Sequence, residues 1–483
     1  MNIFKKIKSY FSIFIFLPII LIFIYKLYNM IIFGLSSDEL FSVGISTHIL
    51  SNGLFPIEFK NFVELNLNDT FMTWKAADQS PILYESVLAI WLLILGDTDV
   101  NAKLLSLIFF LISIIFSYKY LVKDESFMFK ITFFCFMIFT PVLIAFSVEA
   151  RTYMMVFMFS IFLLYQIKCT ILTNGIHLKS NKNILINFFL LLFISFSHYY
   201  GFILAMIILM MYVYLIFKSS LFDKKYLLFL VIPLLVISYI VFFNKLGVEY
   251  ASSGNLAWSA NLNLFSLITK MFEVLYGVIG TSMLFCIFIM FAIFSYRDKE
   301  NKLFNLLSII FLLYTLVYIT LTLKNGTYHI RHYIFILPFV FFIFSYIVDK
   351  NYKYFVVVFI ILSLSFINLK NHPFTGHENY KKAGLLVSEE FKKSNNEINV
   401  ITTWCPNQSF YYYYLKNDIS KNKISCINTL ADFKNHEKII SNPFIIEAHV
   451  GHKPLIDLIL EDKKINCKID QFENINVYSC KKD

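Results

Sequence analysis

The chain has 483 residues, of which 58% are hydrophobic and 15% are charged. Long runs of Phe, Ile and Leu at this density exclude a soluble globular domain and indicate a protein that crosses the membrane many times. The formal net charge of +10 does not indicate nucleic-acid binding, because most Lys and Arg lie in short loops between apolar runs, where basic residues set the orientation of the spans.

The first apolar stretch runs from Tyr10 to Phe33. It is long enough to cross a hydrocarbon core of ~30 Å, which takes about 20 helical residues. Lysines precede this stretch and no small-residue cleavage site follows it, so we expect an uncleaved anchor with its N-terminus in the cytoplasm.

Asp38 and Glu39 follow this span by a few residues. Adjacent carboxylates near lipid are costly and therefore indicate a function. In the functional interpretation, Asp38 is a general base that takes the proton of an acceptor hydroxyl, and Glu39 binds or orients that acceptor. In the structural alternative, Asp38 caps the helix that follows, as Ser36 and Ser37 also can. The residue types alone favour neither reading.

A third acidic residue, Asp78, lies in "KAADQSPILYE" just before a helix that we expect Pro81 to begin. Asp78 either caps that helix or joins the same external site, where it contacts the acceptor, the sugar or a metal ion. The next stretch, Ile82–Gly96, has fifteen residues and contains Glu85. It is short for a crossing, so we expect a helix that lies along the membrane surface.

The positions of Lys and Arg in the later loops test this interpretation. Further apolar runs begin near Leu104, Phe127, Thr152, Ile184, Phe202, Tyr226, Leu264, Leu303, Tyr333 and Phe355. If Ile82–Gly96 does not cross, the loops rich in basic residues all lie on the cytoplasmic side, as the positive-inside rule requires. If it crosses, every later loop inverts and the pattern fails. We therefore predict about eleven spans, a cytoplasmic N-terminus and an external C-terminus.

This topology places the polar residues at several span ends on the external face. They are Asp38, Glu39, Asp78, Glu149 and Arg151 in "SVEARTYMM", His198, Tyr199 and Tyr200 in "SHYYG", and Arg331 and His332 in "TYHIRHYIFILP". The two arginines are candidate phosphate ligands, because a planar guanidinium donates paired hydrogen bonds. Each signal also has a structural alternative: an Arg that reaches lipid headgroups, a His satisfied within the fold, and tyrosines of the interfacial aromatic belt.

From about Leu369 the composition changes to Lys, Asn, Glu and Asp with short apolar segments. Sequence periodicity predicts helices at Glu378–Ser394, Gln408–Asn417 and Lys453–Asp462, and strands at Ile398–Trp404 and Pro443–Val450. Such alternation predicts a small external α/β domain of ~110 residues. We thus divide the chain into a membrane part, 1–369, whose residues 34–103 form the first external loop, and an external part, 370–483. The cysteines of this part, Cys405, Cys426, Cys467 and Cys480, are either free or paired in one of three ways.

These segments together resemble the GT-C superfamily of polyprenyl-phosphate-dependent glycosyltransferases. The chain is most similar to the glycosyltransferase family 39 type, which includes protein O-mannosyltransferases and the aminoarabinose transferases of lipid A. The resemblance covers the acidic pair, "DQSPILYESVLAIWLLILGDTDVNAKLLSLIF", "EARTYMMVFMFSIFLLY", "HYYGFILAMIILMMYVYL", "RHYIFILPFVFFIF" and the tail segment "ENYKKAGLLV". Two departures stand out: many relatives have a double proline and often a His at "DQSPIL", and an Arg is common where Lys103 stands.

The resemblance implies inverting transfer of a hexosyl or pentosyl group from a polyprenyl-phosphate sugar, on the external face of the cytoplasmic (inner) membrane. Asp38 would be the base. Arg151, Arg331 and either His198 or Lys103 would hold the lipid phosphate and stabilise its developing charge. A phosphate is already a good leaving group, so no carboxylic acid is needed to protonate it, unlike in glycoside hydrolysis. The acceptor group is a hydroxyl or a phosphate, and the acceptor stays open among a glycolipid, a polysaccharide and a protein.

By analogy with that family, Asp78, Glu85 and His198 are candidate ligands of a divalent metal, a requirement that the sequence leaves open. Two other functions compete with sugar transfer. One is transport of lipid-linked sugars, for which paired broken helices and polar residues at the membrane midplane are typical. The other is polymerisation or ligation of lipid-linked oligosaccharides. Because the polar groups gather at the external ends of mostly unbroken spans, we expect a transferase.

Overall fold

The computed structural model describes most of the chain in separate stretches. These are residues 34–51, 71–77, 80–218, 223–244, 301–325, 330–351, 380–394, 398–403, 413–415, 418–419, 423–427, 443–449, 453–463, 465–472 and 475–481, with a few isolated positions besides. The contacts divide the chain into two compact units. Unit 1 comprises residues 1–29, 79–84 and 103–372, and unit 2 comprises residues 30–78, 85–102 and 373–483.

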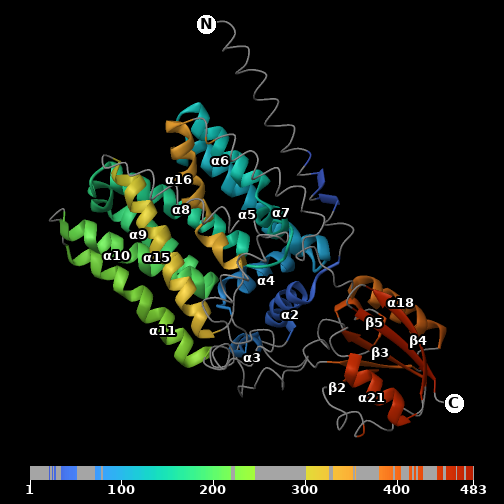
Figure 1. Cartoon of the computed structure of the whole chain (residues 1–483). Coiled ribbons are helices and arrows are strands. Elements are labelled where there is room, and N and C mark those ends of the chain that lie inside the picture. The colour runs from blue at the N-terminus through green and yellow to red at the C-terminus, as the bar shows by residue number, and fades with distance from the viewer. Residues whose placement is uncertain are drawn as a thin grey trace, which may run out of the picture. The chain divides into compact units, whose positions relative to one another are not determined.

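Unit 1 is built of apolar helices (Figure 1). Its described helices are α5 (Asp99–Phe116, with its first four residues in unit 2), α6 (Phe127–Phe139), α7 (Pro141–Phe146), α8 (Tyr153–Leu172), α9 (Asn181–Ser197), α10 (Tyr199–Lys218), α11 (Val231–Phe243), α15 (Lys302–Asn325) and α16 (Leu337–Lys350). A π-helical turn, Ser117–Leu121, extends α5. Short 3₁₀ turns at Lys224–Leu230 and Ile330–Phe335 lead into α11 and α16.

The described residues contain five helical stretches long and apolar enough to cross a membrane. They are Asp99–Leu121, Tyr153–Leu172, Tyr199–Lys218, Lys224–Phe243 and Lys302–Leu321. Each corresponds to an apolar run of the sequence, so the prediction of a polytopic helical membrane protein is confirmed. The runs near Leu264 and Phe355 lie outside the described residues, as does nearly all of Tyr10–Phe33. The total of eleven spans therefore stays a prediction.

The run that begins at Phe127 is broken into α6 and α7. Thr140, at the break, has an extended backbone (φ −69°, ψ 117°). The cause is Pro141, which lacks an amide N–H and disfavours a helical conformation in the residue before it. Pro141 then begins α7, where its missing donor costs nothing.

Polar side chains of three helices form a hydrogen-bonded network inside the apolar bundle. Gln166 on α8 accepts from the Asn187 amide on α9 at 3.3 Å. Asn187 in turn accepts from the Tyr212 hydroxyl on α10 at 2.6 Å. His177, in the turn between α8 and α9, bonds the same Gln166 oxygen through Nε2 at 2.8 Å. These bonds satisfy groups that would otherwise be costly to bury.

The helix α4 (Leu83–Leu95) is short and separate from α5, as its sequence predicts. Thirteen residues span only ~20 Å at 1.5 Å per residue, which is less than a hydrocarbon core. Gly96 ends α4 in the left-handed conformation (φ 88°), where glycine is favoured. The prediction that Pro81 begins this helix is wrong by two residues, because Pro81 and Ile82 form the lead into Leu83.

Unit 2 contains α2 (Ser37–Ser51), α3 (Phe71–Ala77), most of α4 and an α/β part. The α/β part has β1 (Asn399–Thr403), β2 (Ile424–Ile427), β3 (Phe444–His449), β4 (Asn466–Phe472) and β5 (Ile475–Lys481), with α18 (Tyr380–Lys393) and α21 (Lys453–Lys463). The sheet order is β2-β1-β3-β5-β4. The first three strands are parallel, and β5 runs antiparallel to β3 and β4.

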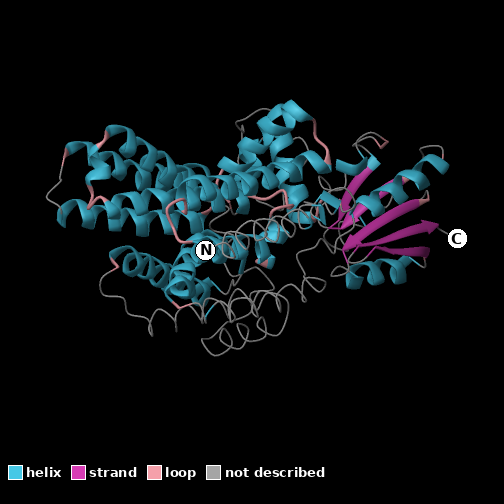
Figure 2. Cartoon of the chain, turned by 90° about the horizontal axis from the view of Figure 1, so that it is seen from above, coloured by secondary structure: helices cyan, strands magenta, loops and turns pink. Residues whose placement is uncertain are grey.

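The two helices α18 and α21 lie on opposite sides of the sheet (Figure 2). Ile456 and Ile459 of α21 pack with Ile446 and Tyr478 in a buried core. The helices α18 and α21 and the strands β1 and β3 lie where sequence periodicity predicted two helices and two strands, so these four predictions are confirmed. Of the helix predicted at Gln408–Asn417, the structure describes the helical residues 413–415.

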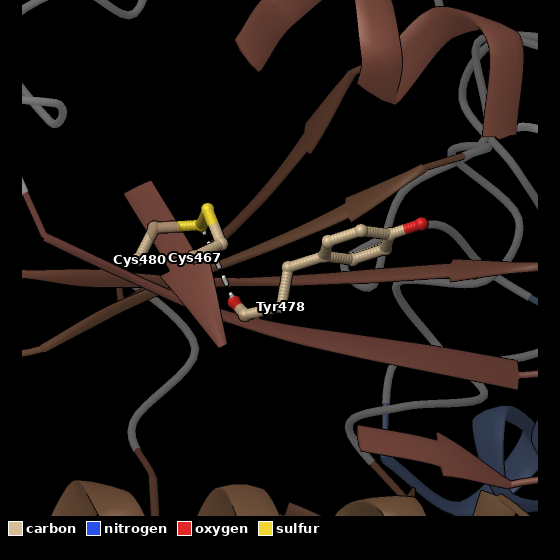
Figure 3. The surroundings of a disulfide bond; sticks show 3 residues. All are labelled: Cys467, Tyr478 and Cys480. Atoms are coloured by element: carbon tan, nitrogen blue, oxygen red, sulfur yellow. Dashed lines mark hydrogen bonds between the residues drawn. A yellow bond between two sulfur atoms is a disulfide. The ribbon is translucent and has the colours of Figure 1, made fainter. Parts of the chain in front are cut away.

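A disulfide joins Cys467 of β4 to Cys480 of β5 (Figure 3). The two residues are direct cross-strand partners, and Cys480 Sγ also lies 3.6 Å from the carbonyl oxygen of Tyr478. The tail cysteines are therefore not all free, and Cys405 lies outside the described residues.

Candidate functional site

Asp38 and Glu39 lie in the first turn of α2, within unit 2. The Ser36 carbonyl oxygen accepts the Leu40 amide N–H at 2.8 Å, which begins the helix. The Glu39 carboxylate accepts the Ser36 amide N–H, also at 2.8 Å. Ser36 and Glu39 thus fit the S-x-x-E spacing of a capping box. Glu39, which is buried, therefore caps the start of α2 with its side chain.

Asp38 is partly exposed at the second position of the helix. The amide groups at a helix N-terminus carry a partial positive charge, which stabilises a carboxylate there by about 0.3–1 kcal/mol at an exposed position. Asp38 is thus a partly exposed carboxylate in the first turn of α2.

A buried ion pair fixes α2 against its neighbours. Lys75 Nζ of α3 lies 3.1 Å from Glu85 Oε2 of α4, and the two side chains are 0% and 3% exposed. The hydroxyl of Ser42, one helical turn after Asp38, donates to Glu85 Oε1 at 3.4 Å. The Phe41 ring packs edge-on against Trp74 at 5.6 Å. Side chains from α3 and α4 therefore hold the helix that carries Asp38.

In unit 1, Arg331 and the segment around Arg151 come together at Tyr153. The Arg331 guanidinium lies over the Tyr153 ring, with Cζ 5.8 Å from the ring centroid, which is cation–π geometry. Arg151 lies two residues before Tyr153, and its carbonyl oxygen accepts from the Ser106 hydroxyl of α5 at 3.4 Å. Both arginines have a buried Nε atom, while the residues as a whole are partly exposed. Guanidinium groups of this kind can donate paired hydrogen bonds to an anion.

The histidines His198 and His332 form an aromatic cluster beside this pair. Their ring centroids are 5.2 Å apart. Tyr200 stacks on His332 at 4.1 Å with an interplanar angle of 21°, and Tyr153 lies 6.1 Å from His198. Both histidines are buried, and the Tyr314 hydroxyl donates to the His332 carbonyl oxygen at 2.7 Å. The structure thus brings Tyr153, His198, His332 and Arg331 together within unit 1, whereas the side of the membrane on which they lie stays a prediction.

The other predicted site residues have plainer surroundings. The Tyr199 hydroxyl donates to Asn244 Oδ1, which ties the start of α10 to the end of α11. Lys103 is buried on α5. Glu149 is partly exposed, and its carbonyl oxygen accepts the Arg151 amide N–H at 2.7 Å. Asp78 lies outside the described residues.

Sequence reasoning missed the partnership of Lys75 with Glu85. Glu85 stood only as a metal ligand by analogy, whereas the structure pairs it with a lysine. The signal was present, because each charge lies in an otherwise apolar helix and buried charges are usually paired. Among the described residues, no group of three or more His, Cys, Asp or Glu side chains is close enough to hold a metal ion.

Sequence comparisons give no relatives: no protein-family model matches the chain, and no curated protein matches it either. Solved structures do match. ArnT from Cupriavidus metallidurans in the apo state has a TM-score of 0.61 at 10% identity, covering 97% of this chain and 98% of that one. The same protein bound to undecaprenyl phosphate gives 0.60 at 10% identity, covering 96% and 98%.

An Archaeoglobus fulgidus oligosaccharyltransferase in complex with Zn and sulfate gives a TM-score of 0.50 at 11% identity, covering 92% of this chain and 69% of that one. At such low identity the likeness concerns the fold, and it extends over nearly the whole chain. The chain therefore shares the overall fold of ArnT and, over most of its length, that of this oligosaccharyltransferase.

Proposed function

We propose that the chain is a membrane glycosyltransferase that moves a sugar from a polyprenyl-phosphate donor to an acceptor hydroxyl, with inversion at the anomeric carbon. The fold shared with ArnT from end to end carries this proposal. The structure of ArnT with undecaprenyl phosphate supports a polyprenyl phosphate as the lipid part of the donor. The residue types at the candidate site give a second support: Asp38 is a carboxylate in the first turn of α2, and Arg151 and Arg331 are cations that can bind a phosphate.

The arginines supply the site for the donor phosphate. The phosphate gains a full negative charge as the sugar leaves, and cations placed where charge develops stabilise the transition state more than the ground state. Arg331 is held in place by the Tyr153 ring, and Arg151 by the backbone contacts around it. His198 and His332, with Lys103 on α5, complete the proposed binding residues together with Glu149 and Tyr199.

Asp38 supplies the base. A carboxylate oxygen of Asp38 takes the proton of the acceptor hydroxyl as that oxygen forms its bond to the anomeric carbon. The bond between the anomeric carbon and the phosphate oxygen breaks at the same time, and the electron pair leaves with the polyprenyl phosphate. One displacement of this kind inverts the anomeric centre and needs one carboxylate, because the phosphate leaves without protonation. Glu39 serves this step by capping the helix.

The proposed reaction takes place on the external face of the cytoplasmic membrane. Basic residues concentrated in alternate loops support this orientation. The Cys467–Cys480 disulfide supports it too, since such bonds persist in oxidising compartments outside the cytoplasm. The acceptor belongs to the glycolipids, the polysaccharides or the proteins of that face.

The test is sugar transfer by membranes that contain wild-type protein, Asp38→Asn or Asp457→Asn, each given a panel of polyprenyl-phosphate sugars. Asp457 is an exposed helical aspartate of α21 and serves as the matched control. We expect Asp38→Asn to lose about 10²- to 10⁴-fold in kcat, the usual contribution of a general base, with donor binding kept and Asp457→Asn unaffected. A wild-type rate in Asp38→Asn would remove Asp38 as the base. Failure of the wild type with every donor would favour polymerisation or transport instead.

A further inference from the structure

Tyr414, in the C-terminal part of unit 2, contacts the chain just before α2. Its hydroxyl oxygen accepts the backbone N–H of Leu35 at 2.7 Å, although the two residues are 379 positions apart in the sequence. Leu35 is fully buried and precedes Asp38 by three residues. The last amide before the capping box of α2 is therefore bound by a side chain of the external part.

Two glycines make room for this contact. A Cβ atom at Gly34 would lie 2.6 Å from Lys381 Cβ and 2.8 Å from the Tyr414 hydroxyl oxygen. A Cβ atom at Gly384, inside the helix α18, would lie 2.8 Å from Tyr414 Cβ. Glycine inside a helix is unfavourable and needs a local reason, and the closeness of Tyr414 is such a reason. We call Gly34, Leu35, Lys381 and Gly384 the Tyr414 seat.

The Tyr414 hydroxyl stays protonated in its seat. Burial raises the pKa of Tyr414, and the nearby carboxylate of Asp99 raises it further. The hydroxyl is thus a neutral acceptor for the Leu35 amide at any ordinary pH, and the contact does not switch with pH.

Further contacts attach the C-terminal part to the start of α5 and to the segment before it. The Tyr413 hydroxyl donates to the Asp97 carbonyl oxygen at 2.8 Å, and Lys381 Nζ lies 3.2 Å from Asp99 Oδ2. These contacts do not use the Tyr414 hydroxyl, although Lys381 also lies close to Gly34. Removal of the Tyr414 hydroxyl therefore leaves both contacts in place and removes the bond to the Leu35 amide.

We propose that Tyr414 is a positioning residue for Asp38, so that the external part of the chain holds the proposed base in its reactive position. This inference rests on the proposed function. The bond to the Leu35 amide anchors the chain directly before α2, and without it we expect the first helical turn to open more often. Because a displacement of 1 Å can lower a rate by about 100-fold, such opening reduces turnover without touching the donor site.

The test compares Tyr414→Phe with Tyr413→Phe in the full-length protein. Both variants remove one hydroxyl from adjacent, partly buried tyrosines whose rings are 5.2 Å apart, but only the first loses the bond to Leu35. Amide hydrogen exchange is measured over residues 35–42, and kcat and KM for the polyprenyl-phosphate donor are measured beside it. In Tyr414→Phe we expect exchange over that segment to rise and kcat to fall, each about 3- to 10-fold as one net hydrogen bond allows, with KM unchanged.

A second variant, Gly34→Ala, places a methyl group too close to Lys381 and the Tyr414 hydroxyl and so disrupts the same contact. We expect it to lower kcat by about 100-fold, and adding Tyr414→Phe to lower kcat little further, because the contact is already lost. Wild-type exchange over residues 35–42 in Tyr414→Phe would overturn the proposal, as would equal effects of Tyr413→Phe or raised exchange with an unchanged kcat. If the wild type transfers no sugar, the proposed function fails, and the exchange data alone decide whether Tyr414 holds α2.

Discussion

The buried ion pair between Lys75 and Glu85 gives the sharpest test of how unit 2 is held together. The perturbation is Lys75→Met, which keeps most of the side-chain volume and removes the charge. The partner carboxylate then stays buried, since Glu85 is 2% exposed, with the Ser42 hydroxyl beside it. Leaving one member of a buried pair without its counter-charge costs about 3–5 kcal/mol. We therefore expect Lys75→Met to lose stability by this amount.

The double variant Lys75→Met/Glu85→Leu removes both charges, so that no unpaired charge stays buried. A buried ion pair replaced by well-packed apolar residues is close to neutral. We expect the double variant to regain most of the stability that Lys75→Met loses, so the two changes are strongly non-additive. Lys468→Met is the matched control, because Lys468 is 73% exposed in its pair with Asp470 and such surface pairs contribute about 0–1 kcal/mol.

The assay is thermal unfolding of the purified full-length protein, followed by exposure of buried tryptophan and tyrosine. At about 2–4 °C per kcal/mol for a unit of this size, Lys75→Met lowers Tm by about 6–20 °C and Lys468→Met by about 0–4 °C. Equal shifts for Lys75→Met and Lys468→Met would refute the reasoning, because burial would then make no difference. An additive double variant would refute it as well.

Three further outcomes follow from the structure. Arg331→Lys keeps the positive charge but loses the planar guanidinium group, and we expect it to weaken binding of undecaprenyl phosphate about 10-fold. Binding is measured by titrating wild type, Arg331→Lys and the uncharged Arg331→Gln with that lipid. Equal binding by wild type and Arg331→Lys would contradict this prediction. Reduction of the disulfide opens a loop closed by Cys467 and Cys480 across 13 positions, so dithiothreitol should destabilise the α/β part by about 2–3 kcal/mol in the wild type and not in the Cys467→Ala/Cys480→Ala variant. Burial lowers the pKa of His177 below its ordinary 6.5, so the unfolded chain binds a proton that the folded chain resists, and stability falls as the pH drops below 6.5; in His177→Gln this part of the acid sensitivity should be lost, and an unchanged pH profile would exclude it.

Local patterns in the sequence predicted most of the elements correctly. The short length of α4 (Leu83–Leu95) and its glycine end separated it from the next span, and period-3.6 patterning placed α18 and α21. The predicted start of α4 at Pro81 was two residues too early. Proline is common in the first helical turn, but here Pro81 lies in the loop before the helix. At Pro141 the apolar run continues through a backbone break, because hydropathy does not register a missing amide donor.

The candidate site was harder to predict, because it depends on contacts between distant segments. His198 and His332 were placed together by an argument about the sidedness of loops, which says which face they share but not which rings touch. The contact of Tyr414 with Leu35 has no local signature, since a tyrosine in a run of four gives no sign of which hydroxyl is used. The capping role of Glu39 was readable in the spacing from Ser36, although Asp38 drew attention first.

The polar network in the bundle bears on how the protein is made. The helix α9 is only 17 residues long and carries Asn187, whose amide bonds Gln166 on the preceding helix and Tyr212 on the following one. Lipid offers no partner for such an amide. We therefore expect the Asn187 amide to be fully satisfied only when α8 and α10 both flank α9, so that packing of these three consecutive helices is interdependent.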